Sequence, residues 1–323
     1  MKRNFVLVLG ALVATAATAQ AQRAQCSGGT TPQQNACNMS ADLFTYMAPQ
    51  LGAVIAGGNT TLGQGGSLGG LPHFAITVRG NALWGSLPKI DQYTPSVTNN
   101  AATTMETADQ VLGLPSVDAA IGVFGGLPLG VTKVGGIDLL LNAAYIPEYS
   151  GNGITVKAPD GSLKIGYGAR LGLLQESLLV PGIGFSYVQR DLPTVDLTAA
   201  SGTNSFNVTG LAVKTTSWRL TASKSLIMFG IAGGLGQDKY ESSASIRGTV
   251  GGLGSAAFSG SQEVTRMNYF GSLSMNLLIA KLVAEIGQVS GGDEDELSTY
   301  NTFEGKAADA SRLYGSVGLR IGF

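Results

Sequence analysis

Residues 313–323, LYGSVGLRIGF, alternate strictly along the last part of the chain. The odd-numbered positions carry apolar residues or glycine, and the even-numbered positions carry small, polar or charged residues, among them Tyr314, Ser316 and Arg320. A period of two is typical of a β-strand with one apolar face. A stretch of about 9–11 residues is also what a tilted strand needs to cross a lipid bilayer.

The same alternation recurs at nine other places in the chain. In one of them Leu163, Ile165 and Tyr167 fall on one face, and Lys164 and Gly166 fall on the other. The pattern predicts ten strands in all, at about 73–84, 117–127, 134–147, 163–173, 179–190, 214–223, 227–238, 266–277, 279–289 and 312–323.

Apart from Lys214 at the first position of 214–223, the charged residues of these segments lie on one face. They are Arg79, Asp118, Asp138, Lys164, Arg170, Arg190, Arg219, Asp238, Arg266, Lys281, Glu285, Arg312 and Arg320. A charge on the lipid face of a membrane barrel costs about 2–4 kcal/mol at mid-bilayer, whereas the lumen tolerates it. A soluble β-sandwich would point the apolar faces inward instead, so alternation alone leaves both folds open.

The connections between the segments favour the membrane fold. Short turns near 128–133, 174–178, 224–226 and 277–279 alternate with long polar connections near 87–116, 148–161, 191–213, 239–264 and 290–311. Short periplasmic turns and long outer loops are typical of bacterial outer-membrane barrels. Backbone groups in lipid must all be paired, so the sheet has to close. We therefore expect an all-β fold, a closed antiparallel up-and-down transmembrane β-barrel of about ten strands (range 8–14).

The N-terminal part has a different composition. Lys2 and Arg3, an apolar run over 5–13 and the A-x-A site at 19–21 predict a cleaved signal peptide, residues 1–21. We expect residues 22–71 to form a partly helical periplasmic or lumen-plugging segment, with a short helix near 41–55, and residues 72–323 to form the barrel. The signal peptide predicts export of the chain.

Two cysteines, Cys26 and Cys37, lie in this exported segment. In an oxidising compartment they are expected to form one disulfide.

Composition excludes several classes of function. Lys and Arg number 20 against 21 Asp and Glu, so no basic excess supports nucleic-acid binding. The chain has one histidine, His73, at the predicted periplasmic end of the first strand. We therefore expect no enzyme activity, no metal site and no cofactor. The acidic run 293–296 is interpreted as a solvated loop, with cation binding to lipopolysaccharide as the alternative.

The final strand resembles the C-terminal signature strand of bacterial outer-membrane proteins, because it ends in Phe323. That resemblance implies recognition by the barrel assembly machinery and insertion into the outer membrane of a Gram-negative-type bacterium. Residues 40–84 run from a possible helix through Gly-rich sequence into LPHFAITVR. They are similar to uncharacterised barrels akin to the FadL-type fatty-acid transporters, which carry an N-terminal segment inside the barrel. Those transporters have more strands and an N-terminal Asn-Pro-Ala signature that this chain lacks.

The lumen is expected to decide the function. Its candidate residues are Arg79, Asp138, Lys164, Arg170, Arg219, Arg266, Lys281, Glu285, Arg312 and Arg320. Their basic excess would favour an anion or the carboxylate of an amphipathic solute. The competing interpretation is that the arginines pair with lumen and loop carboxylates.

Ten strands leave a narrow or plugged lumen. The favoured hypothesis is uptake of a small amphipathic or hydrophobic solute, and the alternative is a non-transporting structural or adhesion barrel that acts through its extracellular loops. Outer-membrane lipid and lipopolysaccharide are the expected surroundings.

Overall fold

The computed structural model describes residues 25–89, 98–99, 102–151, 154–201, 204–250, 254–277, 279–292, 297 and 299–322. The predicted signal peptide (1–21), the acidic run 293–296 and Phe323 lie outside the described residues. Within them, the chain forms the helix α2 and the strands β1–β17. No helix in the described ranges is both long and apolar enough to span a membrane.

Ten strands form a ring of antiparallel pairs. Each pairs with two others, and β10 pairs with both β9 and β12, so the pairings return to their starting point. These strands are β1 (Phe74–Pro88), β3 (Thr107–Phe124), β6 (Gly136–Tyr145), β9 (Leu163–Leu174), β10 (Gly182–Asp191), β12 (Asn204–Ser225), β13 (Phe229–Val250), β14 (Gly254–Asn276), β15 (Ala280–Val289) and β17 (Arg312–Gly322).

The sequence predicts ten strands in the whole chain, and this number is too low, because the described residues contain seventeen. The additional strands lie in the connections: β2 (Thr104–Met105), β4 (Leu127–Leu129), β5 (Thr132–Val134), β7 (Tyr149–Gly151), β8 (Ile154–Lys157), β11 (Val195–Ser201) and β16 (Thr302–Phe303). Much of 191–213 and 239–264, predicted as loop, also belongs to strands. The physical reason is pairing, since β11 and the long ends of β12, β13 and β14 hydrogen-bond to one another.

The two faces of the ring are reversed relative to a water-soluble sheet. Val78 and Ile165 are 60% and 63% exposed, whereas Arg79 and Arg170 are each 2% exposed. The apolar face therefore points outward and the charged face points inward. Hydrocarbon around the ring would stabilise this arrangement, whereas water would not.

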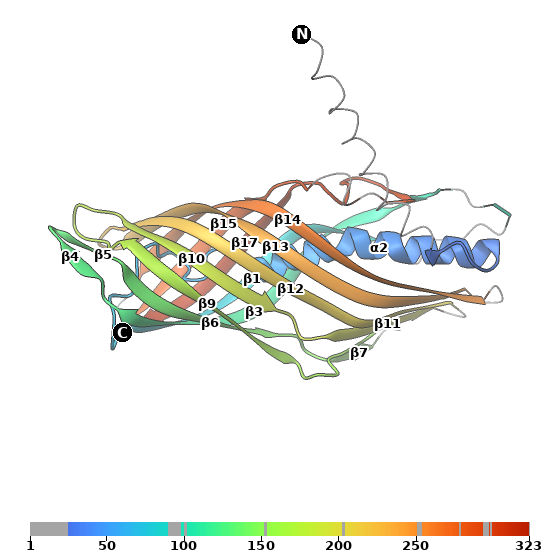
Figure 1. Cartoon of the computed structure of the whole chain (residues 1–323), viewed down its shortest axis with the longest axis horizontal. Coiled ribbons are helices and arrows are strands. Elements are labelled where there is room, and N and C mark those ends of the chain that lie inside the picture. The colour runs from blue at the N-terminus through green and yellow to red at the C-terminus, as the bar shows by residue number, and fades with distance from the viewer. Residues whose placement is uncertain are drawn as a thin grey trace, which may run out of the picture.

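Helix α2 (Thr31–Ala56) lies lengthwise within the strands, at the end of the molecule away from the C-terminus (Figure 1). It contacts β1, β3, β10, β12, β13 and β14. A capping box between Thr30 and Gln33 starts the helix, and Gly57 with a positive φ of 50° ends it. Its 26 residues extend about 39 Å, well beyond the short helix near 41–55 that the sequence predicts.

Helix α2 also supplies an apolar core inside the ring. Tyr46 and Ala56 are fully buried, and they pack in one cluster with Leu83 of β1, Tyr240 of β13 and Tyr314 of β17. The helix is therefore held by strands on several sides of the ring.

Candidate functional site

The coil that follows α2, residues 57–70, crosses the ring toward the short turns, and we call it the inner segment. Its residues are mostly buried, with Asn59 2%, Leu62 0% and Ser67 1% exposed. Seven of its fourteen residues are glycine. The inner segment therefore meets the wall of the ring largely with its backbone.

Three buried ion pairs connect strands of the wall. The exposed fraction of their side chains does not exceed 3%. Buried charges are tolerated only when they are paired and hydrogen-bonded. For these arginines the structure matches the second interpretation of the basic excess, pairing with lumen carboxylates. The pairs are Arg79–Asp118 at 2.8 Å, Arg170–Asp138 at 2.6 Å and Arg219–Asp238 at 2.6 Å.

Arginines of the wall also donate to the inner segment and to the end of α2. Arg79 Nη1 donates to the carbonyl of Asn59 at 3.0 Å, and Arg219 Nη2 donates to that of Gly57 at 3.2 Å. Arg190 donates to the carbonyl of Ala56, and its Nη2 reaches the Thr60 hydroxyl at 2.8 Å. These guanidinium groups satisfy carbonyls that the helix end and the coil leave free.

Carboxylates of the wall accept hydrogen bonds from the same segment. Glu285 Oε1 accepts from the backbone N–H of Asn59 at 3.0 Å. Both oxygens of Asp138 lie 3.1 Å from the N–H of Leu68. Carboxylate and guanidinium groups of the wall thus bind the inner segment near its start, at residues 57–60, and near its end, at Leu68.

Glycines of the wall make room for the inner segment. Gly136, Gly172 and Gly184 are cross-strand neighbours on β6, β9 and β10. A Cβ on Gly184 would lie 2.2 Å from the carbonyl oxygen of Gly65, and one on Gly136 would lie 2.2 Å from the Ser67 hydroxyl. Larger side chains would displace the coil, so these glycines serve close approach.

Arg266 and Arg312 lie nearer the other end of the ring, beside α2. Arg266 Nη2 donates to the carbonyl of Ala308 at 3.0 Å, and Arg312 Nη2 donates to that of Ala307 at 3.2 Å. The Arg312 guanidinium also lies 5.9 Å from the Tyr46 ring centre. These two candidates therefore hold the connection between β15 and β17 over the helix.

The remaining candidates lie at the two rims. Lys164 is exposed at the start of β9. Lys281 and Arg320 are direct cross-strand partners at the end where the short turns lie. His73 lies at that same end, with Nδ1 2.8 Å from the carbonyl of Gly70. The expectation of no enzyme activity stays a prediction.

The sequence did not single out several residues that the structure brings to this site. Arg190, Asp118 and Asp238 were assigned to the inward face but were not chosen as candidates. Asp42 of α2 was missed; its carboxylate accepts from the backbone N–H of Asn301 at 2.7 Å. The strand signal identifies inward charges, but a helical carboxylate that binds a distant loop has no comparable signal.

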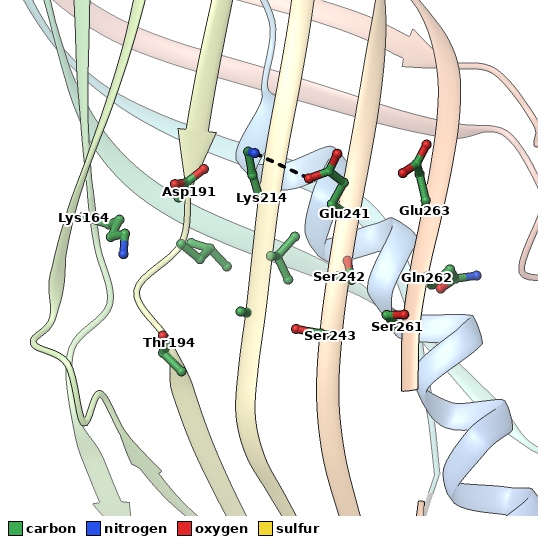
Figure 2. A pocket seen from close by; sticks show the side chains of 13 residues that line it. Lys164, Asp191, Thr194, Lys214, Glu241, Ser242, Ser243, Ser261, Gln262 and Glu263 are labelled. Atoms are coloured by element: carbon green, nitrogen blue, oxygen red, sulfur yellow. Dashed lines mark ion pairs between the residues drawn. The ribbon is translucent and has the colours of Figure 1, made fainter. Parts of the chain in front are cut away.

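A groove of about 400 Å³ lies where the strands leave the apolar part of the wall (Figure 2). Lys214 lies 3.5 Å from Glu241, and Lys239 lies 3.0 Å from Glu241 and 2.8 Å from Glu263. The hydrogen bond from Lys239 lowers the pKa of the Glu241 carboxyl. Lys164 lines the same groove. On β13 the outward residues change at this level from apolar to charged.

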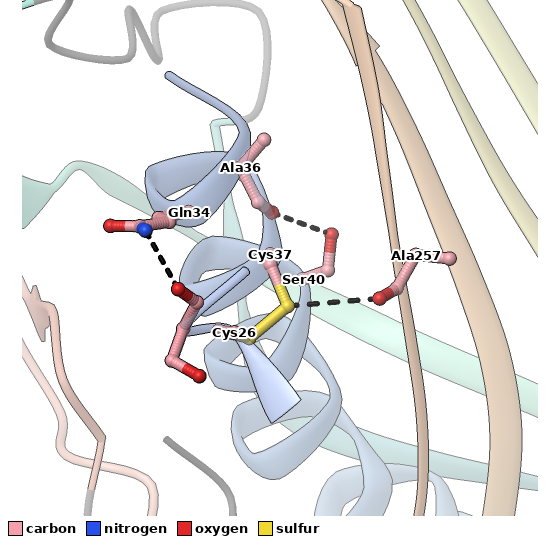
Figure 3. Close-up of a disulfide and its surroundings, with 7 residues drawn as sticks. Cys26, Gln34, Ala36, Cys37, Ser40 and Ala257 are labelled. Atoms are coloured by element: carbon pink, nitrogen blue, oxygen red, sulfur yellow. Dashed lines mark hydrogen bonds between the residues drawn. A yellow bond between two sulfur atoms is a disulfide. The ribbon is translucent and has the colours of Figure 1, made fainter. Parts of the chain in front are cut away.

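The disulfide closes the start of α2 (Figure 3). Cys26 and Cys37 are joined, and Cys37 Sγ lies 3.7 Å from the carbonyl oxygen of Ala257 on β14. Both cysteines are buried in a cluster with Phe44 and Phe258. The disulfide therefore belongs to the contact between α2 and the long end of the sheet.

No family model and no curated protein matches the chain. Among solved structures, Ail of Yersinia pestis is 12% identical over 78% of this chain and 99% of its own, with a TM-score of 0.29. The transport unit of the autotransporter AIDA-I from Escherichia coli is 9% identical over 92% and 100%, with a TM-score of 0.36. The toluene transporter TbuX of Ralstonia pickettii is 10% identical over 93% and 96%, with a TM-score of 0.25. At TM-scores this low, no function is inferred from these likenesses.

Proposed function

We propose that the ring spans an outer membrane as a closed β-barrel, that α2 and the inner segment block its lumen, and that the protein acts at the cell surface. The surface part is the long end of β12, β13 and β14 together with α2, which we call the extension. Its outward face begins at the charged residues Lys214, Lys239, Glu241 and Glu263. At that level a membrane-spanning barrel would meet the lipopolysaccharide phosphates, so lipopolysaccharide is the proposed neighbour of the groove.

The observation that carries this proposal is the anchoring of the inner segment by charged side chains of the wall. Arg79, Arg190 and Arg219 donate to it or to the end of α2, and Asp138 and Glu285 accept from it. A hydrogen bond to a charged group contributes about 1.5–3 kcal/mol to stability. Withdrawal of the segment would break several of them and leave buried charges without partners. The resting barrel is therefore closed to ions.

The extension has an apolar core of its own, which favours a role for it as a folded surface. Phe44 and Ala48 of α2 pack against Ile246 of β13 and Phe258 of β14. Strands that served only to span the membrane would end near the level of Lys239. The extra length instead builds a sheet supported by a helix.

Conductance and surface labelling test the proposal. In planar bilayers, the wild-type protein is expected to show no steady single-channel current. In cells, Ser259→Cys on the exposed face of the extension should react with a membrane-impermeant maleimide, whereas Ile227→Cys in a short turn, 98% exposed in the structure, should react only after permeabilisation. A steady wild-type current, or the opposite labelling of the two cysteines, would contradict the proposal.

Uptake of a small amphipathic solute is the second candidate function. It is favoured by the composition of the inner segment, because a glycine-rich coil held by hydrogen bonds can rearrange while α2 stays packed. A cross-link separates the two functions. A Cβ on Gly172 would lie 2.9 Å from the Ser67 Cβ, so Ser67→Cys with Gly172→Cys can form a disulfide after a shift of about 1 Å.

The readout is entry of labelled palmitate into cells that express the protein. A transporter should lose uptake when the two cysteines are joined and regain it on reduction, with Ser67→Cys alone as the matched control. A surface protein should show no difference in uptake between the cross-linked variant and the control.

A further inference from the structure

The end of the ring that carries the short turns contains a second cavity, of about 420 Å³. Lys281 and Arg320 line it, together with polar residues of the inner segment and of the turns. It lies at the opposite end of the molecule from the extension, so its role goes beyond the proposed surface function.

Two cations face each other in this cavity. Lys281 of β15 and Arg320 of β17 are direct cross-strand partners. Like charges in that position are destabilising unless something else compensates them. Within the described ranges, the side chain of Lys281 has no hydrogen bond or ion pair, whereas each arginine higher in the ring donates at least one hydrogen bond.

Arg320 has donor capacity left over. One of its nitrogens, Nη2, donates to Gln64 Oε1 of the inner segment. Its Nη1 is buried and has no partner among the residues that the structure describes. A buried donor without a partner costs about 1–3 kcal/mol, so the site as it stands lacks an acceptor.

Two nearby side chains that could accept a hydrogen bond are already engaged elsewhere. Glu176, in the short turn between β9 and β10, has a carboxylate that already accepts from the backbone N–H of Ser225 and from the Ser223 hydroxyl. The Gln175 side chain is also engaged, since its Oε1 accepts from the Ser67 hydroxyl at 2.8 Å. An anion bound between Lys281 and Arg320 would accept from the free Nη1 of Arg320 and would compensate both positive charges.

The rim of the cavity is apolar. Phe74, Leu277 and Ile279 line it and are 40%, 47% and 74% exposed. These residues stand where the wall of the ring meets the short turns. An acyl chain could lie along them while its headgroup reaches the two cations.

We propose that this cavity binds the phosphate headgroup of an anionic lipid, with the chain along the apolar rim. Arginine presents a planar pair of N–H groups that matches phosphate oxygens, and lysine adds a point charge beside it. The phosphate can also come from a free ion, and the experiment separates the two sources.

Binding is measured on the full-length protein in dodecyl maltoside by isothermal titration, with dodecyl phosphate and inorganic phosphate as probes. Dodecyl phosphate is expected to bind at least tenfold more tightly than inorganic phosphate. Lys281→Gln and Arg320→Gln should each weaken its binding at least tenfold. Lys133→Gln, an exposed lysine at the same end of the ring, is the matched control and should leave binding unchanged.

Equal affinity for the two probes would overturn the lipid part of the proposal and leave a free-phosphate site. Equal loss in Lys133→Gln and Lys281→Gln would overturn the site itself. If a variant does not fold, photolabelling of the wild-type protein still tests the proposal. A photoactivatable alkyl phosphate should label the turn that contains Leu277 and Ile279, and labelling elsewhere would contradict the proposal.

Discussion

Asp138 connects the wall of the ring to the inner segment, and its charge is the most informative one to remove. Its side chain is fully buried, it pairs with Arg170 at 2.6 Å, and it accepts from the N–H of Leu68 at 3.1 Å. Asp138→Asn keeps the shape of the side chain and an acceptor for Leu68. It removes the negative charge that compensates Arg170.

The expected loss follows from this burial. Removing one partner of a buried ion pair costs about 3–5 kcal/mol, because the other charge is left uncompensated. Glu106→Gln is the matched control, since Glu106 pairs with Lys89 at 2.9 Å with side chains 50% and 37% exposed. Exposed pairs contribute about 0.2–1 kcal/mol. The two variants should therefore differ by at least about 2 kcal/mol in the free energy of unfolding.

The assay is urea unfolding of purified protein in detergent micelles, followed by the fluorescence of Trp84 and Trp218. Adding Arg170→Met to Asp138→Asn should recover part of the loss, because both charges are then absent. If Asp138→Asn destabilises the protein no more than Glu106→Gln does, the charge of Asp138 is not buried as described. The argument for a firmly anchored inner segment would then fail.

Three further perturbations test other parts of the structure. Gly184→Val should displace the inner segment, at a cost of about 1–3 kcal/mol for overpacking, and raise ion conductance. Gly80→Val is the control, because a Cβ on Gly80 meets nothing within 4 Å, and it should change neither stability nor conductance. If Gly184→Val and Gly80→Val have the same effect, the close approach of Gly65 to Gly184 is contradicted. Cys26→Ser should lose about 3 kcal/mol of loop constraint and expose the start of α2 to protease while the ring stays folded; unchanged proteolysis would refute this. A lipid-soluble maleimide should label Val317→Cys, which is on the outward face and 60% exposed in the wild type, and spare Ser316→Cys, which is 1% exposed; the reverse result would place the apolar face inside.

The sequence by itself determined which residues face each way in the ten ring strands. Alternation with a period of two is a local property, and a side chain such as Val78 or Arg79 takes its face from the strand geometry alone. The sequence therefore predicted where each ring strand lies and most of its inward charges, but not how far β3, β12, β13 and β14 extend.

Only the tertiary structure decided what those charges contact and where the strands end. Arg190 binds the end of α2 across 134 positions of sequence, and Asp42 binds Asn301 across 259. The same holds for the strand ends beyond Lys239, which exist because β12, β13 and β14 pair with one another and pack on α2. Contacts between distant segments leave no periodic trace in the sequence, because each partner is chosen by three-dimensional proximity.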